Sequence, residues 1–170
     1  MKESGANVLL IGYGNPGRQD DGLGPAVASA MEKLSLTGVT VDANYQLTVE
    51  DAEAVSRHRV VIFADADARG SEPFSFRAIH PRAGLSFSSH SLEPAAVLAM
   101  ARELFGAEPE GYLLGIRGYR FDELNESLTE KAKTNLALAL AFLQSAFKKN
   151  SFRQAADFSP RAGGGSKEEK

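Results

Sequence analysis

Three polar side chains, far apart in the sequence, have the types that bind a divalent metal. Asp21 lies in a glycine-rich loop, Asp65 follows an apolar run, and His90 precedes a predicted helix. Carboxylate oxygens and an imidazole nitrogen together suit a first-row metal such as nickel or zinc. Three protein ligands leave coordination positions open. The set therefore predicts a metal site that meets water or a ligand carried by a substrate.

Each of these residues also has an ordinary structural role open to it. Burying Asp65 unpaired would cost several kcal/mol, so it caps a helix, pairs with a cation or binds a metal. His90 stands among three serines, where a histidine can be solvated or lie near a helix start. The other two histidines are weaker candidates, because His58 lies between two arginines and His80 precedes a proline.

The glycine-rich loop reads GYGNPGRQDDGLGP, and its first six residues match the pattern G-x-G-x-x-G. With Asp42 after the second predicted strand, this pattern suggests a dinucleotide-binding loop. Such a loop delivers a pyrophosphate to backbone amides at a helix N-terminus, where Asp20 and Asp21 would repel it. A tight strand-to-helix turn explains the glycines but not the adjacent aspartates. GNPG also occurs in peptidyl-tRNA hydrolases, but the histidine that follows in those enzymes is missing here.

Alternating patterns of strands and helices place these residues at the ends of predicted strands. Residues 8–11, 39–41, 60–64, 74–79 and 113–116 predict strands, and residues 26–34, 48–58, 91–105 and 124–147 predict helices. Thr48, followed by Asp51, predicts a helix cap. This alternation predicts an α/β domain with a mainly parallel sheet covered on both faces. Ligands bind outside the carboxyl ends of such strands, where Asp21, Asp65 and His90 would meet.

Length and composition exclude several other classes. A chain of 170 residues predicts one domain, and 43% apolar with 24% charged residues is typical of globular proteins. The net charge of −3 gives no basic surface for nucleic acid or an anionic membrane. The chain has no cysteine and therefore no disulfide, thiolate ligand or thiol nucleophile. We expect a cytoplasmic protein with no nucleic-acid or membrane partner, a domain over residues 1–150 and a flexible tail over residues 151–170.

The three motifs together resemble those of the hydrogenase maturation endopeptidases. The signature of that family, G-x-G-N, a short spacer and D-[DE]-G-x-G, matches residues 12–15 and 20–24. An apolar strand that ends in D-A matches Asp65 and Ala66, and a serine- or proline-flanked histidine that opens a helix matches His90. The order and rough spacing agree over about residues 6–147.

The resemblance implies a fold, a reaction and a site. The fold is a single three-layer domain of phosphorylase/hydrolase-like type, with a twisted, mainly parallel five-stranded sheet. The reaction is removal of the C-terminal extension of a [NiFe]-hydrogenase large-subunit precursor by a monomeric, nickel-sensing endopeptidase of aspartic or metallo type. Asp21, Asp65 and His90 would be both the catalytic residues and the ligands of a nickel ion that the precursor supplies. The substrate-binding residues would be Gly14, Asn15, Asp42 and Gln46.

One loop departs from the best-known members of the family. Residues 42–47 read DANYQL, where those members have an aspartate followed by small residues. Gln46 and Leu47 resemble members that serve soluble, bidirectional-type hydrogenases. Two other functions stay open: a non-catalytic, metal-dependent chaperone of the precursor, which would use the same ligands, and a dinucleotide-binding protein.

Overall fold

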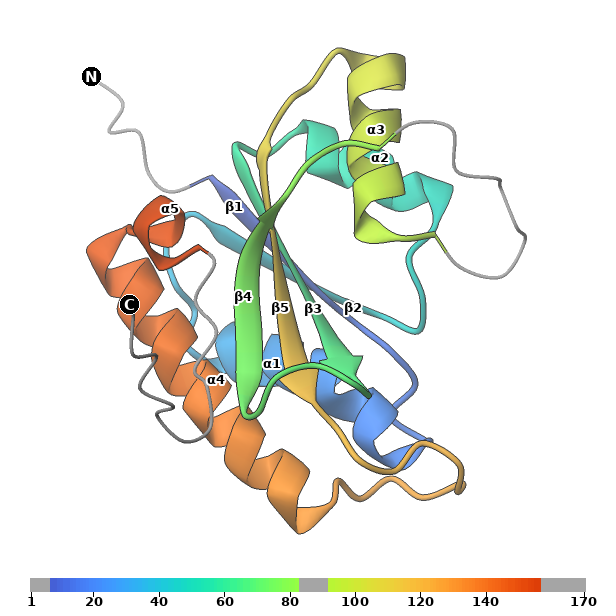
Figure 1. The fold of residues 1–170 in the computed structure, drawn as a ribbon. Helices are drawn as coiled ribbons and strands as arrows, with labels where there is room; N and C mark the ends of the chain where they lie inside the picture. Colours follow the sequence, from blue (N-terminus) through green and yellow to red (C-terminus); the bar gives the residue numbers. More distant parts are fainter. Residues whose placement is uncertain (1–6, 83–91, 157–170) are drawn as a thin grey trace, which may run out of the picture.

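A five-stranded sheet forms the centre of the fold. In the computed structural model, which describes residues 7–82 and 92–156, the strand order is β2-β1-β3-β5-β4 (Figure 1). The strands are β1 (Val8–Tyr13), β2 (Val39–Asn44), β3 (Val60–Asp67), β4 (Phe74–Ile79) and β5 (Glu110–Arg117). Only β4, at one edge, runs antiparallel to its neighbour. The predicted mainly parallel sheet is confirmed.

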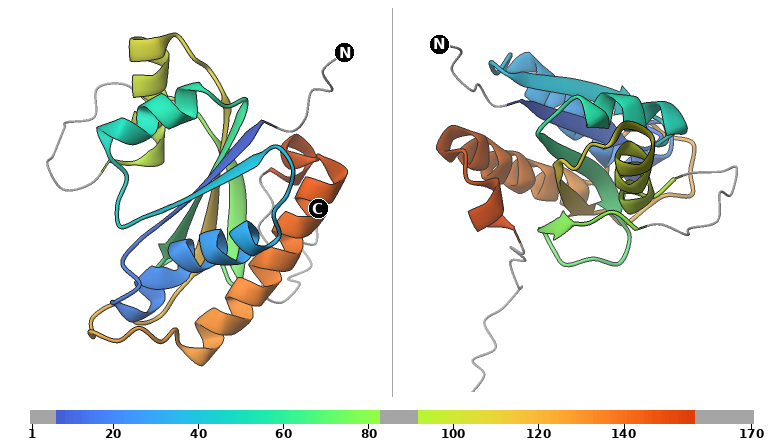
Figure 2. Two further views of the ribbon diagram at one scale, coloured as in Figure 1. Left: turned by 180° about the vertical axis from the view of Figure 1, so that it is seen from behind. Right: turned by 90° about the horizontal axis from the view of Figure 1, so that it is seen from above.

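Helices cover both faces of this sheet. On one face lie α1 (Leu23–Lys33), α4 (Glu130–Lys149) and the short α5 (Phe152–Ala155); on the other lie α2 (Val49–Ser56) and α3 (Pro94–Phe105) (Figures 1 and 2). Of the described helices, none has the length and hydropathy needed to cross a membrane.

The apolar run of β1 explains why both faces are covered. Val8 and Leu10 belong to the core beneath α1 and α4, whereas Leu9 and Ile11 belong to the core beneath α2 and α3. Successive side chains of a strand point to opposite faces, so an uninterrupted apolar run requires burial on both sides. The predicted three-layer α/β arrangement is confirmed.

Several predicted boundaries in the second half of the chain differ from the structure, and the start of the last long helix differs most. The last long helix begins at Glu130 rather than near residue 124, because Thr129 is its N-cap and accepts a hydrogen bond from the Ala132 N–H at 3.3 Å. Beyond residue 150 the chain continues into the short α5. Phe152 is buried there and its ring lies against those of Tyr112 and Phe147.

Candidate active site

The carboxyl ends of β1 and β3 bring Tyr13 and Asp65 together. The two strands are parallel, with Gly12 opposite Ala64, so the next residue of each points to the same face. This is the face of α2 and α3, because Phe63, two residues before Asp65, is buried in that layer. The Tyr13 hydroxyl donates a hydrogen bond to the Asp65 carboxylate. Asp65 thus lies near the carboxyl end of β3, although the strand does not end there as predicted and continues through Asp67.

Asp65 is an unusually weak acid in this environment. The pKa of its carboxyl is raised from 3.8 to about 7, chiefly by burial and to a smaller extent by the nearby charges of Asp21 and Asp67. Hydrogen bonds from the Ala66 N–H, at 2.8 Å to Oδ1, and from Tyr13 oppose the rise in pKa without cancelling it. A carboxylate held in this way is stabilised by a cation placed beside it.

Asp21 lies in a short 3₁₀ turn, η1 (Gln19–Gly22), directly before α1. Its Oδ2 accepts a hydrogen bond from the Asn15 N–H at 2.8 Å, and within the described ranges no hydrogen bond to its Oδ1 is formed. Gly14 makes this contact possible, since its φ is +137° and a Cβ there would lie 2.1 Å from the Asp21 carbonyl oxygen. The glycine loop thus serves the placement of Asp21.

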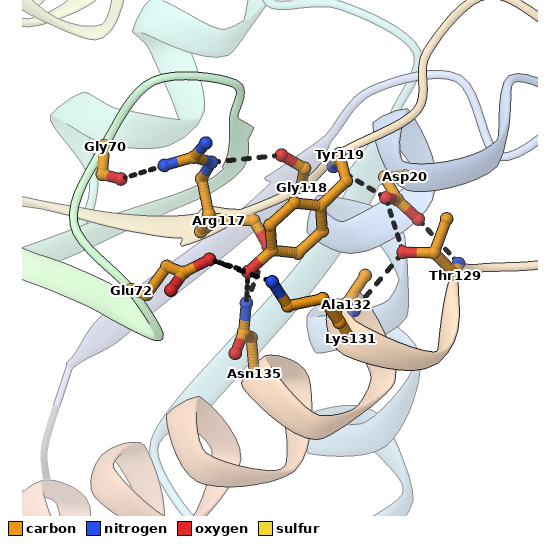
Figure 3. A network of polar contacts seen from close by, with 10 residues as sticks. All are labelled: Asp20, Gly70, Glu72, Arg117, Gly118, Tyr119, Thr129, Lys131, Ala132 and Asn135. Atoms are coloured by element: carbon orange, nitrogen blue, oxygen red, sulfur yellow. Dashed lines mark hydrogen bonds and ion pairs between the residues drawn. The ribbon is translucent and has the colours of Figure 1, made fainter. Parts of the chain in front are cut away.

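Asp20, the other member of the adjacent pair, has a structural role that the sequence did not reveal. Its side chain is fully buried and accepts hydrogen bonds from the Tyr119 N–H, the Thr129 N–H and the Thr129 hydroxyl (Figure 3). The Arg120 N–H also donates to it. Burial raises the pKa of Asp20, but these hydrogen bonds outweigh burial, and the net pKa is lowered. Asp20 therefore holds the loop of residues 118–129 against the turn that carries Asp21.

A second group of contacts anchors the same loop at the end of β5. The Tyr119 hydroxyl donates to Glu72 and accepts from the Asn135 amide at 2.9 Å (Figure 3). The charged groups of Lys131 and Arg117 lie 4.7 and 5.3 Å from the centre of the Tyr119 ring. The loop is therefore tied both to α4 and to the segment before β4.

His90, the third predicted ligand, lies outside the described residues. Within residues 7–82 and 92–156 there is no group of three or more metal-binding side chains. Glu93, at the start of α3, is close enough to Tyr13 to help raise its pKa, after burial and Asp65. The site that the structure describes thus consists of Asp21 and Asp65, with Tyr13 at the end of β1 and the beginning of α3 close to Tyr13.

Three of the four predicted substrate-binding residues line two open pockets. Gly14 contributes to a pocket of about 220 Å³, and Asp42 and Gln46 contribute to one of about 490 Å³. Tyr45 lines both pockets and is 72% exposed. Asn15 instead has its side chain turned into its own loop, where Oδ1 accepts a hydrogen bond from the Gly17 N–H at 2.8 Å.

The larger pocket is acidic. Besides Asp42 it is lined by Glu50 and Asp51. Asp51 forms a capping box with Thr48, which confirms the predicted cap of α2. Burial raises the pKa of Asp51, hydrogen bonds from Thr48 act against the rise, and the charge of Asp42 adds to it.

Fold and site together define an α/β domain with an acidic site at the carboxyl edge of a mainly parallel sheet. No protein-family model and no curated protein matches the sequence. Solved structures do match the fold. They include the hydrogenase maturating endopeptidase HybD from E. coli, with TM-score 0.66 and 19% identity over 85% of this chain and 94% of that one.

Two archaeal structures are similar to a comparable degree. The [NiFe] hydrogenase maturation protease HycI from Thermococcus kodakarensis KOD1 has TM-score 0.65 and 23% identity, over 86% of this chain and 95% of that one. The hydrogenase 2 maturation peptidase from Thaumarchaeota archaeon SCGC_AB-539-E09 has TM-score 0.60 and 23% identity, over 82% and 97%. This chain therefore has the fold of the hydrogenase maturation endopeptidases, as its motifs predicted.

Proposed function

We propose that this protein is an endopeptidase that removes the C-terminal extension of a nickel-loaded [NiFe]-hydrogenase large-subunit precursor. The observation that carries the proposal is the pairing of Asp21 with Asp65, whose pKa is raised to about 7, on a fold shared with hydrogenase maturation proteases. The lack of cysteine fits a reducing compartment. We place its action in the cytoplasm, as a monomer.

The carboxylates of Asp21 and Asp65 fit a metal that arrives with the client. In each, one oxygen accepts a backbone N–H, from Asn15 and Ala66 respectively, and this fixes the carboxylate while leaving capacity for a cation. His90 stands three residues before Glu93, whose charge acts on Tyr13. This position in the sequence supports His90 as the third ligand, leaving the remaining coordination positions to the precursor.

The mutual repulsion of the two carboxylates explains why an empty precursor would be rejected. The charge of Asp21 raises the pKa of Asp65, so the pair is less stable when both groups are ionised. A nickel ion held by the precursor offsets that repulsion and makes the complex favourable. Asp21, Asp65 and His90 would hold the ion together with the precursor, and the bound ion would supply Lewis-acid chemistry for hydrolysis.

The polypeptide of the precursor would lie across the two pockets beside Asp21. Gly14 lines one pocket, with Asn15 next to it in the loop, and Asp42 and Gln46 line the other. Tyr45 offers an exposed aromatic surface between them. Aromatic side chains are frequent anchors of protein–protein contacts. We therefore assign Tyr45 to client binding, together with the four residues that the motifs predicted.

The decisive experiment incubates the purified protein with nickel-loaded and with nickel-free precursor and follows the mass of the precursor. We expect loss of the C-terminal extension only from the nickel-loaded form. Asp21→Ala, Asp65→Ala and His90→Ala should each remain folded and abolish cleavage, whereas Glu103→Ala and His80→Ala, at exposed positions outside the site, should cleave normally. Normal cleavage by the three site variants would contradict the proposal.

The same experiment separates the alternative functions. A chaperone would bind the nickel-loaded precursor and leave its mass unchanged. A dinucleotide-binding protein would show a higher melting temperature with millimolar nicotinamide dinucleotide, and we expect no such shift.

A further inference from the structure

We propose that Tyr13 is a positioning residue for Asp65, holding its carboxylate in the orientation that receives the metal. The inference rests on the proposed function, because it concerns how the same site is prepared. Nothing in the sequence motif requires this residue, since the motif leaves position 13 unspecified between two glycines. The role follows from the order of the strands, which makes β1 and β3 neighbours.

The first support is geometric. The register of β1 and β3 places Tyr13 beside Asp65 with both side chains on the face of α2 and α3. The Tyr13 ring packs against the core of that layer and is therefore held in place by neighbours other than Asp65. A hydroxyl on a packed ring is a donor whose position does not depend on the group that it contacts.

The second support is the pattern of hydrogen bonds to Asp65. Its Oδ1 accepts the Ala66 N–H at 2.8 Å, and the carboxylate also accepts the Tyr13 hydroxyl. Two donors from different directions restrict the rotation of the carboxylate plane. Partners of this kind orient metal ligands and are often as important as the ligands themselves.

The contribution of the Tyr13 hydroxyl can be separated from that of its ring. A purely structural tyrosine would contribute ring packing alone, and Tyr13→Phe preserves that packing while removing only the hydroxyl.

A matched control exists within the same sheet. Tyr112 also donates its hydroxyl to a carboxylate, that of Glu110 at 3.1 Å, but it lies at the beginning of β5, away from the carboxyl edge. Tyr112→Phe thus removes the same chemical group from the same kind of contact. Any effect common to both variants would be a general cost of losing a tyrosine–carboxylate hydrogen bond.

The test measures kcat and KM for nickel-loaded precursor, and the melting temperature, in wild type, Tyr13→Phe, Tyr112→Phe and Asp65→Ala. We expect kcat to fall about 10-fold to 100-fold in Tyr13→Phe, the usual effect of losing such a partner. KM should change little, and Tyr112→Phe should resemble wild type. The melting temperature of Tyr13→Phe should stay within a few degrees of wild type.

Each outcome bears on a different claim. Wild-type kcat in Tyr13→Phe, alongside an inactive Asp65→Ala, would overturn the role of Tyr13 and leave the proposed function intact. An equal fall of kcat in Tyr13→Phe and Tyr112→Phe would also overturn it, because the loss would then be general. Normal cleavage by Asp65→Ala, or no cleavage by wild type, would overturn the proposed function and the role of Tyr13 with it.

Discussion

Asp20 and Thr129 are 109 positions apart in the sequence and are joined by two hydrogen bonds of 2.8 Å, one from the Thr129 N–H and one from its hydroxyl. Thr129 is also the N-cap of α4. The contact therefore fixes the beginning of the longest helix to the turn that carries Asp21. It separates the roles of the adjacent aspartates: Asp20 holds the fold together, and Asp21 is left for the site.

Asp20→Asn should lower the free energy of unfolding by about 3 kcal/mol, because an amide NH₂ would face several N–H donors and the charge that strengthens their bonds is lost. The measurement is urea unfolding, with Asp21→Asn as control, which should change stability by less than about 1 kcal/mol. The pKa of Asp20 is lowered below its ordinary 3.8, so its contribution is present above pH 3.8 and is lost as the pH falls through its folded pKa. The difference in the free energy of unfolding between wild type and Asp20→Asn should therefore become smaller in acid. Equal unfolding midpoints at neutral pH would show that the contact is not stabilising.

Asp65→Asn should stabilise the metal-free protein at neutral and alkaline pH. The pKa of Asp65 is raised from 3.8 to about 7 in the folded state, so the folded protein binds the proton more tightly than the unfolded chain. Stability of the wild type then falls as the pH rises from about 4 to 7 and levels off above. The measurement is the melting temperature of wild type and of Asp65→Asn between pH 4 and pH 8. The melting temperature of Asp65→Asn should exceed that of wild type by little at pH 4 and by most at pH 8. A difference in melting temperature that does not change with pH would contradict the raised pKa.

Gly14→Ala should damage the site far more than an ordinary glycine substitution. Gly14 has φ +137°, and a Cβ there would lie 2.1 Å from the Asp21 carbonyl oxygen, so the turn that carries Asp21 must shift. Gly106→Ala is the matched control: its φ is +67°, but a Cβ would meet nothing within 4 Å. Gly106→Ala should lower the free energy of unfolding by about 1–2 kcal/mol, the cost of a left-handed backbone at a residue with a Cβ, and should keep its cleavage activity. Unfolding and precursor cleavage are measured for both, and similar losses in the two variants would refute the role of Gly14 in placing Asp21.

Tyr45→Ala should weaken client binding without changing the fold. The side chain is 72% exposed, so its removal costs little stability, whereas an aromatic anchor at an interface contributes about 1–2 kcal/mol. The expected result is a rise in KM for nickel-loaded precursor of about 5-fold to 30-fold with kcat nearly unchanged. Leu104→Ala, which removes a side chain 63% exposed near the end of α3, is the control. If both variants keep the wild-type KM, the client does not cross the loop that carries Tyr45.

The sequence determined the class of fold, because the signals that specify it are local. Uninterrupted apolar runs in β1 and β3 demand burial on both faces, and alternating helices supply the covering layers. The position of Asp65 near the carboxyl end of its strand could be predicted for the same reason. Thr48 and Asp51, three residues apart, likewise predicted the start of α2 correctly.

Tertiary structure alone decided which groups meet. Two adjacent aspartates look alike in a sequence. Only the contacts of residues 118–129 show that both carboxylate oxygens of Asp20 accept hydrogen bonds from that loop, whereas Asp21 accepts one from Asn15. The predicted start of α4 was wrong for the same reason, because its N-cap residue, Thr129, is held in place by hydrogen bonds to Asp20. The contact of Tyr13 with Asp65 depends on β1 and β3 being neighbours in the sheet. Periodicity reports the environment of one segment, whereas strand order and long-range hydrogen bonds arise from packing between segments.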